Sequence, residues 1–207
     1  MPRPLTRPER EAIRARLLEA GQELFARHGL KKTTVEELAR AAGIAKGTFY
    51  LFFRSKEALY GHVLLEELPR MVAQLVDRSF AATDDTREAL VRFQEELVTL
   101  VEDDEIVRAA AADPRELAQL LEGHLDLQEY QRRAMDALAP LFGTIQTAQA
   151  EGRIVEGDLD EIFAVLGIIK LLPYYRKHLA PELYPRLVKR LTQVVADGLT
   201  CPAGRRR

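Results

Sequence analysis

Cysteine is almost absent from this chain of 207 residues, in which Cys201 is the single one. One cysteine cannot form a disulfide within the chain, which is typical of proteins of the reducing cytosol. No stretch approaches the about 18 uncharged apolar residues that a membrane span needs. The opening residues, MPRPLTRPER, are polar and lack the apolar core of a secretory signal. These absences predict a cytoplasmic protein, without membrane contact, that begins with a flexible basic arm carrying Arg3 and Arg7.

Patterns that accompany catalysis or metal binding are missing as well. The histidines are far apart and form neither a His-x-x-x-His pair nor a Glu-x-x-His motif; they are His28, His62, His124 and His178. There is no Gly-x-Ser-x-Gly motif and no glycine loop that could cradle a phosphate. The acidic cluster at 102–105 has no histidine beside it, so we interpret it as a solvated helix junction rather than a metal site. We expect no enzymatic activity, no cofactor and no metal.

Strand signals are nearly absent, since the sequence has no alternating β-branched runs and no Asn-Gly or Asp-Gly hairpin turns between such runs. The predicted fold class is therefore all-α. The charge is uneven along the chain: residues 1–60 hold 12 Lys+Arg and 7 Asp+Glu (net +5), and residues 61–207 hold 18 and 25 (net −7), which sum to −2. A basic N-terminal part on an acidic remainder is typical of a DNA-binding head on a body that does not bind DNA.

Residues 33–56, TTVEELARAAGIAKGTFYLFFRSK, have the pattern of two helices joined by a tight turn. Thr33 and Thr34 are both candidates for the N-cap of the first helix. Gly43 stands where the chain must turn through a left-handed conformation, which glycine adopts without strain. The apolar residues of the first helix recur at helical spacing, at Val35, Leu38 and Ala39. The pattern predicts a helix-turn-helix, although two packed helices without a DNA-binding role would share this outline.

The second helix, predicted from Ala45 to about Phe53, begins with small or polar residues and one cation: Ala45, Lys46, Gly47 and Thr48. A buried helix would carry larger apolar side chains there. A helix whose N-terminus approaches phosphates and base edges needs small residues, free amides and a cation. We expect Tyr50 to be exposed, and Phe49 and Phe53, four residues apart, to face the interior. This composition favours a recognition helix that lies on DNA.

At these positions the sequence resembles the DNA-binding region of the TetR (tetracycline repressor) family of transcriptional regulators. The shared motifs are Thr34, Ala41-Ala42-Gly43-Ile44, Lys46-Gly47-Thr48-Phe49-Tyr50 and Ser55-Lys56-Glu57-Ala58-Leu59. An earlier helix that ends at Gly29 also fits, with one apolar face made of Ile13, Leu17, Ala20, Leu24 and Phe25. The resemblance covers about residues 8–65, and many positions agree in register.

The resemblance implies roles for individual residues. Thr34 would cap the second helix of the domain and contact a phosphate, and Tyr50 and Lys56 would clamp backbone phosphates. The residues of the recognition helix would lie at the major groove, with Thr48 at a base edge; they are Ala45, Lys46, Gly47, Thr48 and Leu51. The chain departs from the family at Leu51, where an aromatic residue or histidine is common, and at Phe52. Leu51 can contact a thymine methyl group but cannot hydrogen-bond a base.

The resemblance further implies an N-terminal three-helix domain and a C-terminal helical domain that binds a ligand and dimerises. We expect the arm and helix-turn-helix domain at 1–55, the second domain at 56–200 and a disordered tail at 201–207. The helix at 160–172 is apolar nearly all round, so it must be covered on several sides. Pairing of two copies through residues 158–199 would cover it, by way of Ile162, Val165, Leu166, Ile169, Leu187, Leu191 and Val194; burial wholly within one monomer is the alternative.

Family members usually respond to a small molecule held in the C-terminal domain. The candidate lining residues are large groups on otherwise apolar faces, each of which would also suit an ordinary core: Phe93, Tyr130, Phe142, Phe163 and Tyr174. A basic rim for an acidic ligand such as an acyl-CoA would come from His124, Arg132, Arg133, Arg176 and Lys177, unless these side chains only form a solvated face. An aromatic or hydrophobic effector fits the same lining.

The function that these inferences favour is a dimeric repressor. It would bind a pseudo-palindromic operator and be released by a small apolar or amphipathic ligand. The alternative is a ligand-independent helical protein that binds DNA or a protein partner. A ligand that stabilises the native state would discriminate between the two.

Overall fold

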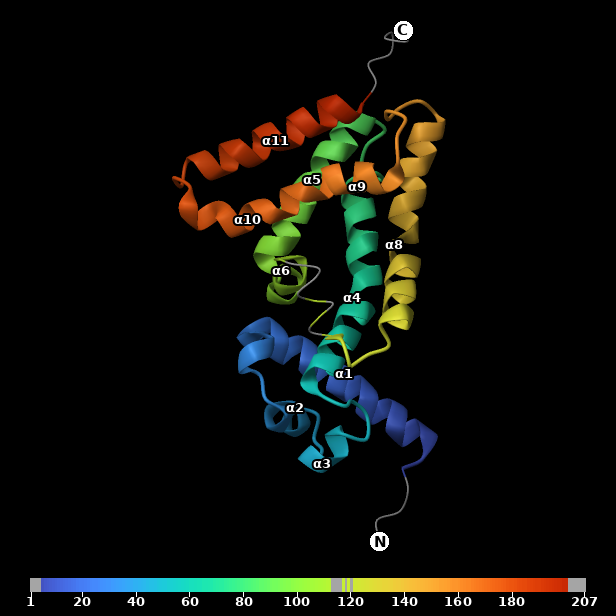
Figure 1. Cartoon of the computed structure of the whole chain (residues 1–207), viewed down its shortest axis with the longest axis vertical. Coiled ribbons are helices and arrows are strands. Elements are labelled where there is room, and N and C mark those ends of the chain that lie inside the picture. The colour runs from blue at the N-terminus through green and yellow to red at the C-terminus, as the bar shows by residue number, and fades with distance from the viewer. Residues whose placement is uncertain (1–4, 113–116, 118, 120, 201–207) are drawn as a thin grey trace. The chain divides into compact units, whose positions relative to one another are not determined.

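The computed structural model of this chain describes residues 5–112, 117, 119 and 121–200. Arg3 of the predicted arm, and Cys201 with the rest of the predicted tail, lie outside these residues. The part of the chain that is described folds into helices and contains no strand, and one isolated antiparallel bridge joins Ile154 and Thr200. The all-α prediction is therefore confirmed (Figure 1). Among these helices, none is long and apolar enough to cross a membrane.

The chain divides into two compact units, and the division does not follow the order of the sequence. The first unit contains residues 1–67 and 104–133, and the second contains 68–103 and 134–207. The division therefore falls within a helix, after Glu67, and the segment 104–133 lies with the N-terminal residues. Each unit has its own core of buried apolar side chains.

The first unit is built from α1 (Arg7–Lys32), α2 (Val35–Ala41), α3 (Lys46–Phe49), the beginning of α4 (Lys56–Arg78), α6 (Glu105–Ala112) and the beginning of α8 (Leu127–Ala150). Its core contains completely buried side chains from four of these helices: Leu17, Phe25, Leu38, Phe49 and Leu59. Tyr60 adds an edge-on contact with Phe25 and donates a hydrogen bond of 3.0 Å to the carbonyl of Ile106. The core thereby joins α1, α4 and α6.

The N-terminal arm is shorter than the sequence suggests. Helix α1 already begins at Arg7, because Thr6 and Glu9 form a capping box in which each satisfies the other's backbone N–H. At the other end, Gly29 has φ +71°, so the regular helix is interrupted there as predicted.

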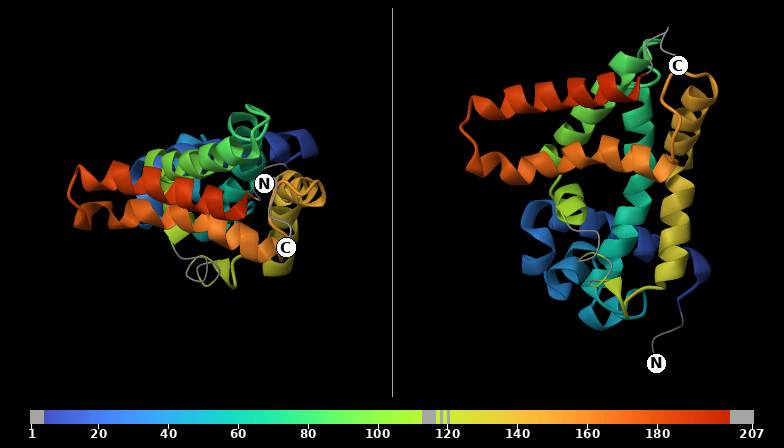
Figure 2. Two further views of the ribbon diagram at one scale, coloured as in Figure 1. Left: turned by 90° about the horizontal axis from the view of Figure 1, so that it is seen from above. Right: turned by 45° about the horizontal axis from the view of Figure 1, so that its top comes forward.

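The second unit contains the end of α4, α5 (Thr86–Asp103), most of α8, α9 (Leu159–Gly167), η1 (Ile168–Leu171), α10 (Leu172–Tyr175), η2 (Arg176–His178) and α11 (Leu183–Leu199). Asp158 caps α9 by accepting hydrogen bonds from two backbone amides. Figure 2 shows α11 returning beside the segment from α9 to α10, and α5 contacts both. The core between them includes Leu90, Ile145, Leu166 and Ala196.

Residues 102–105 serve as a helix junction, as expected. The Asp104 carboxylate accepts hydrogen bonds of 2.8 and 3.1 Å from the amides of Ile106 and Val107, and so caps α6. Glu105 pairs with Arg108 in the next turn, and Glu102 accepts a hydrogen bond of 2.9 Å from Arg176.

Candidate nucleic-acid interface

Helix α2 begins at a capping box made by Thr34 and Glu37. The Glu37 carboxylate accepts hydrogen bonds of 2.8 Å from both the amide and the hydroxyl of Thr34, and the Thr34 oxygen accepts one of 3.2 Å from the Glu37 amide. The hydrogen bond from the Thr34 hydroxyl lowers the pKa of the Glu37 carboxyl. Thr33 is fully buried and instead donates its hydroxyl proton to the carbonyl of Gly29, at 2.8 Å. Of the two candidate caps, the structure selects Thr34.

The turn between α2 and α3 has the predicted left-handed glycine. Gly43 has φ +67°, and its amide donates to the carbonyl of Arg40 at 3.1 Å. The amide of Ile44 donates to the carbonyl of Ala39 at 2.9 Å, which closes the turn. This geometry directs α3 away from α2 at a fixed angle and leaves its first residues at the surface.

Helix α3 is shorter than predicted. It ends at Phe49 instead of continuing to Phe53, and residues 50–52 form turns. These turns keep amide-to-carbonyl hydrogen bonds from Leu51 to Thr48 and from Phe53 to Phe49, so the backbone still coils and the side chains keep near-helical directions. A segment this short gains little from helix propagation, and Gly47, which has low helix propensity, lies within it.

The side chains of α3 and its following turn divide into a buried and an exposed set. Phe49 and Phe53 are buried, as predicted, and pack with ring centroids 6.0 Å apart. Tyr50 is 50% exposed and Leu51 is 61% exposed. The other residues predicted to contact DNA are exposed at Ala45, Lys46 and Gly47 and half-buried at Thr48. The two phenylalanines therefore anchor α3 while its other face stays accessible.

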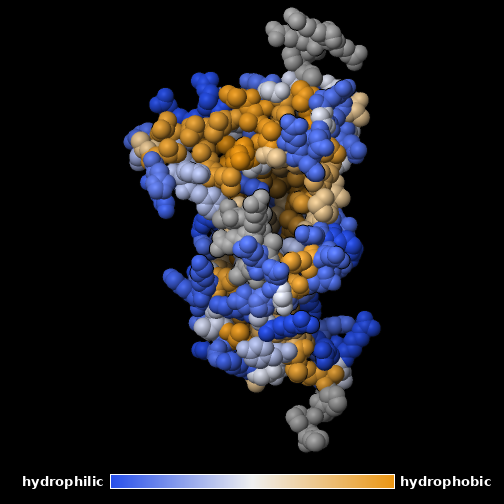
Figure 3. Space-filling model, in the orientation of Figure 1, coloured by the Kyte–Doolittle hydropathy of each residue, from blue (hydrophilic) through white to orange (hydrophobic). Residues whose placement is uncertain are grey.

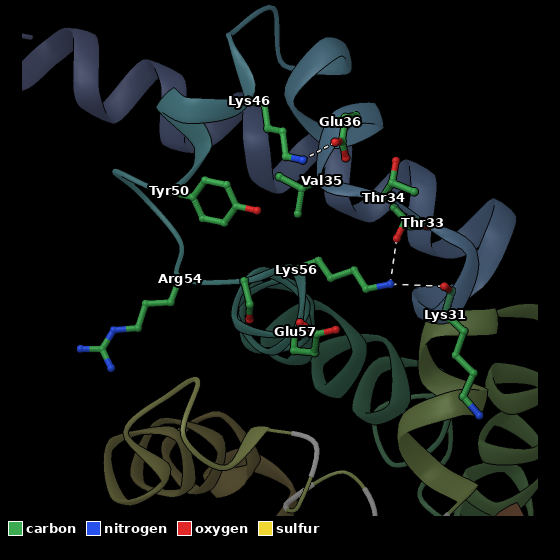
Figure 4. A pocket seen from close by; sticks show the side chains of 11 residues that line it. Lys31, Thr33, Thr34, Val35, Glu36, Lys46, Tyr50, Arg54, Lys56 and Glu57 are labelled. Carbon is green, nitrogen blue, oxygen red and sulfur yellow. Dashed lines mark hydrogen bonds and ion pairs between the residues drawn. The ribbon is translucent and has the colours of Figure 1, made fainter.

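A groove of about 360 Å³ lies between the beginning of α2, α3 and the beginning of α4 (Figure 4). Polar and charged side chains predominate in its lining, which consists of Lys31, Thr33, Thr34, Val35, Glu36, Lys46, Tyr50, Arg54, Ser55, Lys56 and Glu57. Four of the residues predicted to contact DNA meet there: Thr34, Lys46, Tyr50 and Lys56. Glu36 and Arg54 also belong to this site and were not predicted from the sequence, although each charged residue lies two positions from a predicted one.

Lys46 does not stand free in the groove. Its ammonium forms a hydrogen-bonded ion pair with the carboxylate of Glu36, in the first turn of α2 (Figure 4). This hydrogen bond lowers the pKa of the Glu36 carboxyl and raises the pKa of Lys46. Both side chains are about half exposed, so the pair lies at the surface of the groove.

Lys56 is bound to the end of α1. Its ammonium donates hydrogen bonds to the carbonyls of Leu30 at 2.8 Å, Thr33 at 2.9 Å and Lys31 at 3.3 Å. An ammonium group has three protons, so these carbonyls engage all of them. Lys56 thus joins the first turn of α4 to the connection between α1 and α2. Ser55 caps the same turn, since its hydroxyl oxygen accepts a hydrogen bond of 3.1 Å from the amide of Ala58.

The residues predicted to line a ligand pocket fall in both units. Tyr130 belongs to the first unit, and the other four belong to the second. In the second unit, Phe142 and Phe163 are half-buried and meet edge-on with ring centroids 4.3 Å apart. Phe93 is buried against Phe80 in the core. Tyr174 is half-buried.

The predicted basic rim is likewise divided between the units, and most of its members are paired. In the first unit, His124 and Ser55 share a hydrogen bond of 2.9 Å, and Arg132 and Arg133 pair with glutamates. In the second unit, Arg176 pairs with Glu102 and Lys177 is exposed.

The residues predicted to form a dimer interface separate into two groups. Ile162, Leu166 and Ile169 are at most 3% exposed, because they pack into the core of their own protomer. Val165 is 38% exposed and Val194 is 56% exposed, and Leu187 and Leu191 are half-buried. Further apolar side chains are exposed at Ile168 of η1, Tyr175 of α10 and Leu183 of α11. Figure 3 shows apolar surface gathered over α9 and α11.

Comparison with known proteins gives matches in the region of this groove. Residues 17–63 match the family model described as "Bacterial regulatory proteins, tetR family". A stretch of 44 residues, 21% of the chain, is 50% identical to the uncharacterized HTH-type transcriptional regulator YerO of Bacillus subtilis and covers 15% of it. The HTH-type transcriptional repressor KstR2 of Rhodococcus jostii is 35% identical over 105 residues, which are 42% of this chain and 52% of KstR2. The chain thus spans about half of KstR2 and a smaller share of YerO.

Similarity to solved structures extends over nearly the whole chain. The crystal structure of RolR in complex with the ligand resorcinol superposes with a TM-score of 0.65, at 20% sequence identity, and covers 95% of this chain and 99% of RolR. At this level of identity the likeness concerns the fold.

Proposed function

The chain belongs to the TetR family of bacterial regulatory proteins, and we propose that it is a dimeric repressor that binds a pseudo-palindromic operator and releases it when a small molecule binds. The observation that carries this proposal is the division of side chains on α3. Phe49 and Phe53 fix the helix to the core, and Lys46, Gly47 and Leu51 face outward. An exposed face of this composition suits close approach to a major groove.

The proposed interface separates contacts that position the protein from contacts that read the sequence. Tyr50 lines the groove and presents a hydroxyl group suited to a phosphate oxygen, and Arg54 adds a cation there. Thr34 also lines the groove, and a phosphate would replace Glu37 as the acceptor of its hydroxyl proton. Thr48 and Leu51 belong to the base-reading part, where Leu51 suits a thymine methyl group. The net charge of +5 over residues 1–60 supports attraction of this unit to DNA.

Dimerisation is supported by the apolar surface of the second unit. Val165 and Ile168 on the α9–η1 segment, and Leu183 and Val194 on α11, leave large parts of their side chains exposed. A contiguous apolar surface of this kind on a folded domain marks an interaction site. A two-fold pair would bury these side chains and present two recognition helices to successive half-sites.

The proposed effector is a small apolar or amphipathic molecule, of a class that includes aromatic compounds and acyl-CoA. Two observations support it: the half-buried Phe142–Phe163 pair in the second unit, and the fold shared with RolR, whose crystal structure contains resorcinol. Such a ligand would weaken DNA binding by the ratio of its affinities for two states of the dimer: one whose recognition helices do not match the spacing of the half-sites, and one whose helices do.

The test is binding to the DNA that flanks the coding sequence, or to duplexes selected from a random pool, across a salt series. We expect saturable binding, a palindromic footprint and affinity that falls steeply with salt. Gly47→Ala is the informative variant, because a Cβ at Gly47 would meet nothing within 4 Å and so leaves the fold intact. On DNA the same methyl group would occupy space between α3 and the bases, so we expect operator affinity to fall about tenfold or more.

The matched control is Gly143→Ala, whose Cβ also meets nothing within 4 Å and which lies in α8. The proposal is supported if the control binds the operator as wild type does, whereas Gly47→Ala binds it more weakly while being at least as stable to heat as wild type. Equal operator binding by both variants would contradict the placement of α3 in the major groove of the DNA. Wild-type binding to the operator that is no tighter than to random DNA would contradict the proposal of a repressor.

A further inference from the structure

The ion pair between Glu36 and Lys46 occupies the groove in which the proposed function places DNA. Glu36 is 52% exposed and Lys46 is 51% exposed, and both line the groove. Lys46 is the cation of α3 and the side chain best placed by charge to attract a phosphate. In the protein without DNA, a carboxylate of the same chain already holds its ammonium.

Glu36 differs from its neighbour Glu37 in what its carboxylate does for the fold. The Glu37 carboxylate closes the capping box of α2 through two hydrogen bonds to Thr34. The Glu36 carboxylate instead forms its ion pair with Lys46, across to α3. An exposed ion pair adds little to stability. The place of Glu36 in the first turn of α2 also favours a carboxylate, but only by about 0.3–1 kcal/mol, and Glu36 closes no capping box.

A carboxylate and a phosphate compete for the same ammonium protons. When DNA enters the groove, Lys46 must exchange Glu36 for a phosphate oxygen, and the released carboxylate then lies beside the negatively charged backbone. Both consequences oppose binding. Because phosphates are the same in every sequence, the opposition applies to operator and random DNA alike.

We propose that Glu36 is an internal competitor for the DNA phosphate, which holds Lys46 in the free protein and thereby lowers the affinity for DNA of any sequence. This inference rests on the proposed function and adds to it a residue that sets affinity without reading bases. Lys46 can then contact a phosphate only by giving up the Glu36 carboxylate, which weakens that contact.

The experiment compares wild type, Glu36→Gln, Lys46→Gln and the double variant on the selected operator and on a random duplex of the same length, across a salt series. We expect Glu36→Gln to bind both duplexes about two- to fivefold more tightly for each protomer bound. The slope of log K against log salt becomes steeper, by up to about one for each protomer, because Lys46 then neutralises a phosphate fully. In the Lys46→Gln background, the gain from Glu36→Gln is smaller.

The matched control is Glu23→Gln, which removes the same charge from an exposed position on α1, in the same unit but outside the groove lining. A gain equal to that of Glu23→Gln would overturn the proposal in favour of a net-charge effect. An equal gain with and without Lys46 would also overturn it, since Glu36 would then act by repulsion alone. A loss of affinity, or a change at one base pair only, would mean that Glu36 orients Lys46 or reads a base. Absence of wild-type binding to either duplex would refute the repressor first, so the two failures are distinguishable.

Discussion

Lys56 illustrates how a residue's role changes once its partners are known. The resemblance to the TetR family assigns it to a DNA phosphate, but its ammonium donates to the carbonyls of Leu30, Lys31 and Thr33. A phosphate contact would require it to give up one of these. Its position in the groove suits both a phosphate contact and a structural role. The hydrogen bonds favour the structural role, in which Lys56 links α4 to the end of α1.

Replacement of Lys56 by Gln separates the two roles. We expect a loss of stability of about 1–3 kcal/mol, because three backbone carbonyls lose a charged donor, and this loss appears in denaturant unfolding. If Lys56 has only this structural role, the slope of log K against log salt for DNA binding stays at the wild-type value at temperatures where both proteins are folded. Lys32→Gln, at an exposed position on α1, controls for the loss of charge. A slope that falls by about one per protomer for Lys56→Gln alone would assign Lys56 to a phosphate instead.

Residue-level predictions from sequence succeed where one physical requirement fixes the residue. Gly43 is predictable because the turn needs a positive φ, and Phe49 and Phe53 because their spacing places both on one helix face. The pairing of Glu36 with Lys46 is not predictable in this way. Ten residues separate the two, and only the angle between α2 and α3 brings them together.

At the scale of elements, the close approach of residues 121–125 to α4 depends on Gly61. A Cβ at Gly61 would lie 2.3 Å from Leu125 and 3.0 Å from Leu121, both on the segment that precedes α8. The shared hydrogen bond of Ser55 and His124 holds the same segment to the first turn of α4. The segment is thereby part of the first unit, although the sequence assigns it to the C-terminal domain.

Comparison of Gly61→Ala with Gly143→Ala tests this packing. In an open helical position such as Gly143, alanine stabilises by up to about 1 kcal/mol through helix propensity. At Gly61 the methyl group must displace the two leucines, which costs about 1–3 kcal/mol and offsets or exceeds that gain. We expect thermal unfolding to move upward for Gly143→Ala and to stay or move downward for Gly61→Ala. Equal upward shifts would mean that residues 121–125 do not pack tightly on α4.

Element boundaries show why periodicity predicts helices better than it predicts their ends. The apolar residues of α4, α8 and α11 recur at helical spacing, because burial of one face repeats over many turns. Helix α4 contains Pro69 and still runs from Lys56 to Arg78. Helix α3 ends earlier than its pattern, since the burial of Phe53 needs only the turn that follows it.

At the scale of the whole molecule, the apolar helix near residue 165 is not buried wholly within its own protomer, and pairing of two copies stays a prediction. One face packs within the protomer through Ile162, Leu166 and Ile169. The other face carries Val165 and Ile168 to the surface. Sequence alone shows only that the helix must be covered on several sides; which of its residues stay exposed on the protomer depends on the packing of α5 and α11 against it.

Replacement of Val194 by Glu tests whether this surface pairs two copies. Val194 is 56% exposed, and glutamate has good helix propensity, so the fold of the protomer should persist. In a two-fold interface the new charge would be buried twice without a partner, and we expect the dimer dissociation constant to rise about a hundredfold or more. Sedimentation at several concentrations measures this. Met135→Glu on α8, at 53% exposure, is the matched control and is expected to remain dimeric. Because a monomer presents one recognition helix, Val194→Glu would also lose the cooperative protection of both half-sites, whereas a dimer that survives the substitution would place the interface elsewhere.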